Sequence, residues 1–324
     1  MEREASVAID WRTKRVLVTG GAGFLGSHVV GHLLDRGCEN VFIVRSKEYD
    51  LTKEEAVSQL YAEHPADIVI HLAGLVGGIE PNSKYPATYF YQNLMMGVLI
   101  MHYAWKSGAE KLVCAGAGCG YPENAPLPLK EEYFWDGFPQ EPSFAYSLAK
   151  RMLHVQSRAY GKQYGFPAIV TIPGNIYGPY DNFDLENAHV IPALVRKFVE
   201  ATSNGNHDTV EVWGTGRATR DFVFAGDVAE GMLRAAEVYN AGELVNLSSG
   251  REHSILEVVS TLVEITGYQG EVQWQRSRPE GQCRRLFDIG KAARDLAYEA
   301  KTPLWEGLKQ TVDWYRANRQ FARN

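Results

Sequence analysis

The first part of the chain alternates short apolar runs with longer amphipathic stretches, and this alternation restricts the possible folds most. The apolar runs have the length of strands and span residues 15–19, 41–45, 68–71, 111–115 and 168–172. The stretches between them have a helical pattern, near residues 24–36, 52–64, 85–108 and 143–165. Strands that are apolar on both faces and separated by helices form a parallel sheet covered on each side. The sequence therefore predicts a doubly wound α/β fold.

A glycine-rich turn follows the first predicted strand. The segment V-L-V-T-G-G-A-G-F-L-G, residues 16–26, joins that strand to the start of a helix. Glycines at this spacing let the backbone approach a pyrophosphate, and the N-terminus of the helix faces its negative charge. The sequence thus predicts a Rossmann dinucleotide site. Its expected residues, in this turn and directly after the third strand, are Gly20, Gly23, Phe24, Leu25, Gly26, Leu72 and Ala73.

The end of the second strand bears on the choice between NAD and NADP. An acidic residue there holds the ribose hydroxyls and repels a 2′-phosphate, whereas basic residues favour the phosphate. This chain reads Val44-Arg45-Ser46-Lys47, and the first carboxylate is Glu48. We therefore expect NADP, with Arg45 as a cofactor contact and NAD as the less favoured cofactor. The alternative is that Arg45 is a solvated surface base.

Composition excludes several classes of protein. With 45% hydrophobic and 22% charged residues, the chain is typical of a globular protein. A net charge of −6 without a basic tract argues against binding to nucleic acid or to a membrane surface. The four cysteines form no C-x-x-C pair, which favours a reducing compartment and no metal site. The most apolar window, residues 93–105, is too short to span a bilayer. We expect a cytoplasmic protein.

The pattern changes after Pro173, where a long loop rich in Gly, Pro and Asn begins. Beyond it we expect helices near 189–203, 226–238, 254–267 and 303–318 and short strands near 210–213 and 219–224. This part is predicted to form a second, smaller α/β substrate-binding lobe that exchanges segments with the first. The predicted dinucleotide-binding domain is residues 1–175 plus about 219–247. The predicted substrate domain is residues 176–218 plus 248–324.

Tyr146 and Lys150 lie one helical turn apart after the fourth strand, so their side chains share one face of the helix. Such a Tyr-x-x-x-Lys pair is common by chance, and its meaning comes from its place in a chain with the dinucleotide turn. Together these features resemble the extended short-chain dehydrogenase/reductase family. The resemblance implies that Lys150 holds the nicotinamide ribose and lowers the pKa of Tyr146. Tyr146 would then exchange a proton with a substrate hydroxyl or carbonyl.

Further motifs are similar to the GDP-L-fucose synthase group of that family. They are V-G-G-I at 76–79, Y-Q-N-L-M-M at 91–96, N-I-Y-G-P at 175–179, D-N-F at 181–183, H-V-I-P-A at 189–193, V-W-G at 212–214, R-D-F at 220–222 and P-E-G-Q-C-R-R at 279–285. The resemblance implies epimerisation of a GDP-linked 4-keto-6-deoxy sugar at carbons 3 and 5, followed by hydride transfer from NADPH to the ketone. It also implies that Cys119 and His189 are the acid/base pair.

Each member of that pair has a plain structural alternative. Both epimerised carbons flank the ketone, so their protons are acidic and the site needs a base on one face and an acid on the other. A cysteine is also a small hydrophobe that often lies in a core, and a histidine near a helix start often only satisfies the backbone. We favour the functional interpretation of Cys119 and His189, and the structural one for Cys114 and Cys38.

One expected residue is missing. The family has a Ser or Thr at the position of Ala117, whose hydroxyl would help to polarise the ketone, and the run 115–118 contains no hydroxyl. Loss of one donor to a developing oxyanion commonly costs about 2.7–4 kcal/mol. Three explanations remain open: Tyr146 acts alone, another donor such as Ser143 or Ser147 substitutes, or reduction is lost. The related 4,6-dehydratases place Asp-Glu where this chain has Gly118-Cys119, so a dehydratase is disfavoured.

The second lobe is expected to bind the nucleotide part of the substrate. Two phosphates and a planar base need guanidinium groups and an aromatic shelf. The expected substrate contacts are Asn175, Arg196, Trp213, Arg220 and Arg284. Arg196 is otherwise the polar face of a helix and Trp213 a core aromatic. The resemblance further implies a homodimer that pairs the helices near 85–108 and 143–165.

Three functions therefore remain after the sequence is considered. The favoured one is an NADP-dependent epimerase/reductase of a sugar nucleotide. The second is an epimerase that reduces poorly because of Ala117. The third is a non-catalytic NADP-binding sensor or scaffold, although such a protein would gain nothing from Cys119, Tyr146, Lys150 and His189 together.

Overall fold

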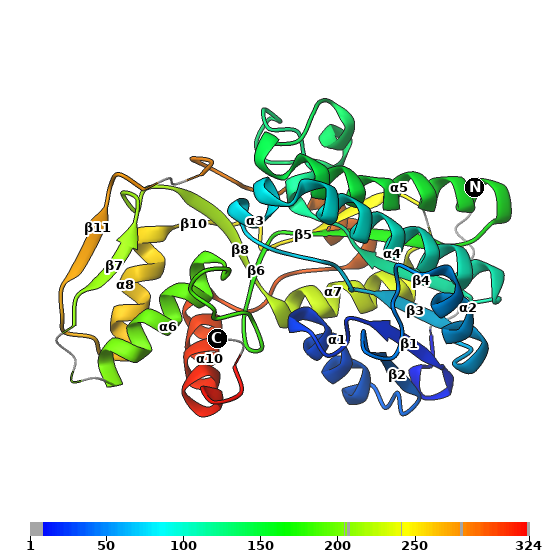
Figure 1. The fold of residues 1–324 in the computed structure, drawn as a ribbon, viewed down its shortest axis with the longest axis horizontal. Helices are drawn as coiled ribbons and strands as arrows, with labels where there is room; N and C mark the ends of the chain where they lie inside the picture. Colours follow the sequence, from blue (N-terminus) through cyan, green and yellow to red (C-terminus); the bar gives the residue numbers. More distant parts are fainter. Residues whose placement is uncertain (1–8, 204, 206–207, 241, 279–280, 323–324) are drawn as a thin grey trace.

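The computed structural model describes residues 9–203, 205, 208–240, 242–278 and 281–322, which form two lobes side by side (Figure 1). Pro279 and Glu280 of the late motif lie outside the described residues. The larger lobe holds most of the first half of the chain. The smaller lobe holds the helices and short strands at the left of Figure 1.

Six parallel strands form the central sheet of the larger lobe, in the order β2-β1-β3-β4-β5-β9. They are β1 (Val16–Thr19), β2 (Val41–Val44), β3 (Ile68–His71), β4 (Lys111–Ala115), β5 (Ala168–Pro173) and β9 (Leu244–Leu247). Strands β1, β3, β4 and β5 are buried at every residue, which explains their mainly apolar sequences. The predicted doubly wound parallel sheet is confirmed.

Helices cover both faces of this sheet. One face packs against α2 (Glu54–Glu63), α4 (Pro86–Lys106) and α5 (Phe144–Tyr164), with Leu17 and Val69 of the sheet in that core. The other face packs against α1 (Phe24–Asp35), α7 (Ala225–Val238) and α9 (Gly290–Leu296), with Val16 and Ile68 in that core. Short helices lie at 79–84 (α3) and, as 3₁₀ turns, at 11–13, 118–120, 131–135 and 141–143.

The smaller lobe has two small sheets and three helices around a core of its own. One sheet has the order β10-β8-β6, and the other pairs β11 with β7. The strands are β6 (Asn175–Tyr177), β7 (Val210–Trp213), β8 (Thr219–Phe224), β10 (Glu252–Ser254) and β11 (Val272–Gln275). The helices are α6 (Val190–Ser203), α8 (Ile255–Thr266) and α10 (Leu304–Asn318).

The chain passes between the two lobes more than once. Strand β8 belongs to the three-stranded sheet, whereas α7 and β9, which follow it, belong to the larger lobe. The order of the central strands reverses direction between β1 and β3, and in open α/β sheets ligands bind at the carboxyl ends of the strands at such a point. Within the described ranges, no helix combines the length and the apolar character that a membrane crossing needs.

Candidate active site

The glycine turn between β1 and α1 forms a cradle that side chains would fill. Gly20 has a φ of +70°, and a Cβ there would lie 2.8 Å from the backbone nitrogen of Ala73. A Cβ at Gly26 would lie 2.1 Å from the carbonyl oxygen of Gly20. Gly23 caps α1 without a side chain, so the amides of Phe24 and the next residues begin the helix at an open end. The turn therefore leaves no room for side chains at Gly20 and Gly26, and its binding of a pyrophosphate stays a prediction.

Thr19 fixes the neighbouring end of β3 against this turn. Its hydroxyl oxygen accepts hydrogen bonds from the backbone nitrogens of Leu72 and Ala73, each at 3.2 Å. The same hydroxyl lies 2.7 Å from Nδ1 of His71, to which it donates because its oxygen already accepts two bonds. Burial, with a smaller effect of Lys150, lowers the pKa of His71 to about 3, so this imidazole is neutral.

Arg45 lies at the end of β2 with its side chain exposed. Its carbonyl oxygen accepts hydrogen bonds from the backbone nitrogens of Glu48 and Tyr49, each at 3.0 Å, so the chain turns directly after the strand. The guanidinium is therefore presented at the edge of the sheet where the second strand ends. Its contact with a phosphate stays a prediction.

Lys150 lies deep in the site, on the face of α5 toward the sheet. Its Nζ donates to the carbonyl oxygen of Ala115 at the end of β4, at 3.1 Å. A Cβ at Gly74 would lie 3.4 Å from that Nζ and 3.0 Å from Oδ1 of Asn93, so these groups enclose one space. Burial lowers the pKa of Lys150, which makes no ion pair with a carboxylate among the described residues.

Tyr146 is half-buried one turn before Lys150. Burial raises its pKa, and neighbouring Cys119 and Tyr89 raise it further. The family resemblance implied that Lys150 would lower this pKa. The structure differs because the Lys150 ammonium is directed at the Ala115 carbonyl.

Cys119 lies in a 3₁₀ turn whose two neighbouring carbonyls are each held by an arginine. Arg285 donates from Nη2 to the carbonyl of Gly118, and Arg151 donates from Nε to the carbonyl of Gly120 at 2.7 Å. Burial lowers the pKa of both guanidinium groups, and the nearby Cys119 partly offsets that effect. The two arginines thus hold the backbone turn of Cys119 from both sides.

No side chain next to Ala117 in the sequence replaces the missing hydroxyl. Ala117 is buried, and its neighbours have no room for a side chain: a Cβ at Gly116 would lie 2.5 Å from Cδ1 of Ile172. Ser147 is fully buried and its hydroxyl donates to that of Ser143 at 3.5 Å. Ser143 is half-buried and directly precedes α5.

His189 belongs to the smaller lobe, at the start of α6, where its carbonyl accepts from the backbone nitrogen of Ala193 at 3.1 Å. The side chain is exposed, yet the surrounding protein lowers its pKa by desolvation. The two predicted acid/base residues therefore come from different lobes, Cys119 from the larger and His189 from the smaller.

The predicted nucleotide contacts fall into two groups. Arg196 pairs with Glu200 at 3.1 Å and donates to the carbonyl of Phe183, also at 3.1 Å. Arg284 pairs with Glu252, with Nε and Oε1 3.0 Å apart. These two guanidinium groups are held by their own lobe.

The other predicted contacts lie closer to the junction of the lobes or are more exposed. Asn175 donates to the carbonyl of Asp221 at 3.3 Å, and Arg220 is the preceding residue on β8. Trp213 is 56% exposed, with the guanidinium carbon of Arg278 5.0 Å from its ring centroid. An exposed indole is not the core aromatic that was the alternative for Trp213.

Asp221 joins the segments behind the site and was not predicted. It is fully buried, and its carboxylate accepts four hydrogen bonds. Two come from Ser249, whose backbone nitrogen lies at 3.0 Å and whose hydroxyl lies at 2.6 Å. The others come from the backbone nitrogens of Gly250 at 3.1 Å and Phe287 at 3.2 Å. Burial raises its pKa. Its own nitrogen donates to the carbonyl of Arg285 at 2.9 Å, so it places the segment that carries the Gly118 partner.

Sequence reasoning missed five residues around the site, namely Tyr89, Asn93, Arg151, Asp221 and Arg285. Asn93, Asp221 and Arg285 lie inside quoted motifs, and Arg151 directly follows Lys150. These places in the sequence were the available signal. Their contacts, however, depend on segments far away in the chain.

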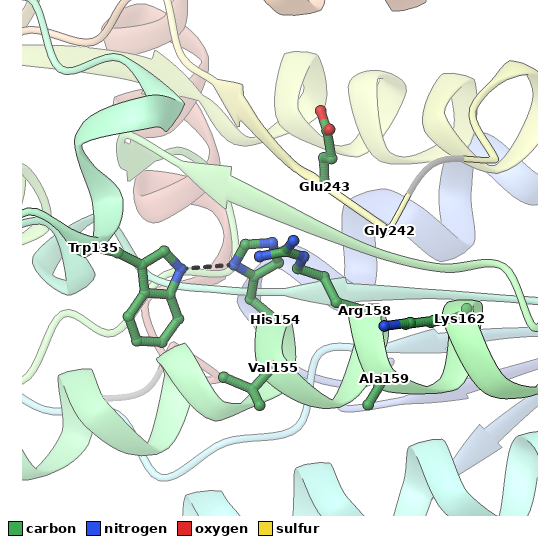
Figure 2. Close-up of a pocket in the computed structure, with 9 residues that line it drawn as sticks. Trp135, His154, Val155, Arg158, Ala159, Lys162, Gly242 and Glu243 are labelled. Carbon is green, nitrogen blue, oxygen red and sulfur yellow. Dashed lines mark hydrogen bonds between the residues drawn. The ribbon is translucent and has the colours of Figure 1, made fainter.

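A pocket of about 510 Å³ lies elsewhere, along the C-terminal half of α5 (Figure 2). It is bordered by Trp135, His154, Arg158, Lys162 and Glu243 among others, and the indole nitrogen of Trp135 donates to Nδ1 of His154 at 3.0 Å. None of the predicted site residues borders it. Among the described residues, no three His, Cys, Asp or Glu side chains gather as a metal site.

Comparison with known proteins identifies the family. The model of the NAD dependent epimerase/dehydratase family matches residues 16–248. The chain belongs to this family. It is 36% identical to GDP-L-fucose synthase 1 of Arabidopsis thaliana, over 95% of this chain and 94% of the relative. It is 33% identical to GDP-L-fucose synthase of Escherichia coli, over 96% and 99%.

Solved structures of the family are similar over nearly the whole chain. A GDP-L-fucose synthetase from Naegleria fowleri has a TM-score of 0.92 at 27% sequence identity, and the match covers 98% of both chains. A second structure of that name, bound to NADP, has a TM-score of 0.89 at 27% identity and covers 99% of this chain and 98% of the other. A GDP-6-OMe-4-keto-L-xylo-heptose reductase from C. jejuni has 0.89 at 28%, covering 96% and 100%. The chain is thus a nicotinamide-dependent sugar-nucleotide epimerase/reductase of the extended short-chain dehydrogenase/reductase type.

Proposed function

We propose that this enzyme uses NADPH to convert a GDP-linked 4-keto-6-deoxy sugar, by epimerisation at carbons 3 and 5 and then reduction of the ketone at carbon 4. The observation that carries the proposal is the grouping of Cys119, Tyr146 and Lys150 at the carboxyl ends of the strands. The names of the plant and bacterial relatives support the GDP-sugar as substrate class.

The residues present fit NADPH. The cradle between Gly20 and Gly26 accepts a pyrophosphate, and exposed Arg45 offers a charge for a 2′-phosphate. Lys150, buried without a carboxylate partner among the described residues, is available to a ribose hydroxyl. The NADP-bound Naegleria fowleri structure supports the same choice of cofactor. When bound, NADPH supplies the hydride that reduces the ketone.

Epimerisation would use one group on each face of the sugar. One member of the Cys119 and His189 pair removes a proton from the carbon beside the ketone, and the electron pair of that C–H bond moves onto the ketone oxygen as an enolate. The other member returns a proton to the opposite face of the carbon. No atom is gained or lost, and the configuration is inverted. The origin of the two residues in different lobes supports this arrangement.

Reduction would use Tyr146 as the proton donor to the ketone oxygen. Because burial raises the pKa of Tyr146, the phenol stays protonated near neutral pH, which is the form that a donor needs. The Arg285 and Arg151 contacts keep Cys119 in place during both stages.

The nucleotide would bind on the smaller lobe. Exposed Trp213 offers a flat surface for a base, and Arg220 and Asn175 lie where the lobes meet. Arg196 and Arg284 would reach a diphosphate after leaving Glu200 and Glu252. The division of the chain into a dinucleotide-binding domain and a substrate domain, with the bounds predicted from the sequence, is also part of this proposal.

The assembly that we propose is a homodimer formed through α4 and α5. Phe90 and Val98 on α4 are large apolar side chains at the surface, which a partner helix would cover. Light scattering should then report a mass near twice the 36.2 kDa of one chain.

The four cysteines are free, which supports a reducing compartment such as the cytoplasm.

The product mass after incubation with NADPH and GDP-4-keto-6-deoxymannose in heavy water tests the function. We expect deuterium at both epimerised carbons together with a reduced ketone. Deuterium without reduction would favour the epimerase that lacks reductase activity because of Ala117. An unchanged mass would contradict the proposed substrate, and the GDP-heptose reductase among similar structures makes a GDP-linked 4-keto heptose the next one to assay.

A further inference from the structure

The missing hydroxyl at Ala117 raises the question of which group takes its place beside Tyr146. The side chain of Tyr89, on α4, is one such group. Its ring centroid lies 6.4 Å from that of Tyr146, with the ring planes at 79°. A proton donor here would act on the same oxygen as Tyr146.

Tyr89 is held in place from several directions. The residue is 6% exposed, and its carbonyl accepts from Nδ2 of Asn93 at 2.8 Å. Its hydroxyl lies against the V-G-G-I loop, since a Cβ at Gly77 would be 2.3 Å from the phenolic oxygen. Any larger residue than glycine at position 77 would displace this hydroxyl.

The hydroxyl of Tyr89 has no hydrogen-bond partner among the described residues, although the rest of the side chain is buried. The phenolic oxygen is not one of the buried polar atoms that lack a partner, so it opens onto space that solvent can reach and can bond to a ligand there. Its surroundings are the ring of Tyr146 and the Gly77 backbone, both of which border the proposed ketone site.

We propose that Tyr89 is a catalytic hydrogen-bond donor to the ketone oxygen of the substrate, and that it takes over the part that a hydroxyl at position 117 would play. The inference rests on the proposed function. Tyr146 transfers its proton to that oxygen, whereas Tyr89 keeps its proton and donates a hydrogen bond to the charge that develops. Because the enolate carries its charge on the same oxygen, Tyr89 serves epimerisation as well as reduction.

Tyr89→Phe removes one oxygen atom and leaves the packing of the ring. We expect kcat for NADPH oxidation and the rate of deuterium uptake at the epimerised carbons to fall together, by about 100-fold, with little change in KM. Tyr103→Phe is the matched control, because Tyr103 is a buried tyrosine of the same helix whose hydroxyl donates to Glu54 at 3.1 Å. This control should keep its kcat.

Ala117→Ser provides the rescue that a merely structural role of Tyr89 would not show. In the Tyr89→Phe background the new serine should restore at least a tenth of the wild-type kcat, and in the wild type it should change kcat little. If the wild type is active and Tyr89→Phe keeps its kcat, the proposed role of Tyr89 is wrong and the proposed function stands. A folded wild type without exchange or reduction would overturn the proposed function and this role together.

Discussion

Single residues at this site have protonation states set mainly by burial. His71 is neutral because it is enclosed beneath the glycine turn, and Tyr146 stays protonated for the same reason. Lys150 and Arg151 are positively charged groups in the same buried region without carboxylate partners among the described residues. The site is therefore arranged to receive negative charge from its ligands.

The neutral state of His71 predicts a pH dependence of stability. Its pKa is about 3 in the folded chain and about 6.5 in an unfolded one, so between these values the unfolded state binds more protons. The free energy of unfolding should decrease as the pH falls below about 6.5, by at most about 1.4 kcal/mol per pH unit from this residue. Above that pH the contribution is complete.

Urea denaturation at about pH 7 and about pH 5 measures this effect. His71→Gln should lose less stability between the two pH values than the wild type loses. His154, whose pKa burial lowers to about 4, contributes to the slope that remains in the variant. Equal slopes for the wild type and His71→Gln would show that His71 is not the group that titrates.

Elements of the larger lobe were predictable because their sequences agree with their environment. Strands β1, β3 and β4 are buried throughout and apolar except at Thr19, His71 and Lys111, and the predicted bounds of β3 and β4 match the observed ones. Strand β9 was missed because Asn246 interrupts its apolar pattern. That amide donates to the carbonyls of Leu129 and Asp288, at 2.9 and 3.1 Å, which only the folded chain brings together.

The candidate site was predictable to a similar extent. Tyr146, Lys150 and the glycine turn have signals within a few residues of sequence, and the structure places them at one end of the sheet. Arg285 lies inside a quoted motif and Arg151 directly follows Lys150, but nothing in the local sequence shows that each bonds a carbonyl next to Cys119 from a distant segment. The same is true of the Tyr89 hydroxyl.

The glycine turn makes a prediction about α1. Gly26→Ala would place a Cβ 2.1 Å from the Gly20 carbonyl, so the turn must shift, and we expect NADPH affinity to fall by at least tenfold. Gly31→Ala is the matched control in the same helix, where a Cβ meets nothing within 4 Å. It should stabilise the chain by about 0.5–1 kcal/mol.

Fluorescence titration with NADPH and urea denaturation measure the two quantities for each variant. If Gly26→Ala binds NADPH as tightly as Gly31→Ala does, the turn between β1 and α1 is not the pyrophosphate cradle.

On the scale of the whole molecule, the two lobes each supply part of the proposed chemistry. The larger lobe contributes Cys119, Tyr146 and Lys150, and the smaller lobe contributes His189. Asp221 ties the β8 strand of the smaller lobe to the segment that holds Arg285 against the Cys119 turn. The proposed reaction therefore depends on the contact between the lobes, and its two stages use different side chains for proton transfer.

The most direct test of this account measures deuterium uptake and NADPH oxidation side by side in Cys119→Ser and Tyr146→Phe, with NADPH binding as the check on folding. Cys119→Ser should bind NADPH but lose deuterium uptake at the epimerised carbons, because it lacks the thiol that exchanges the proton. Tyr146→Phe should lose NADPH oxidation by at least 100-fold, because the proton donor to the ketone is gone, and should keep more of the uptake than of the oxidation, because Tyr89 still donates to the enolate oxygen. Full turnover in both variants would contradict the assignment of the site.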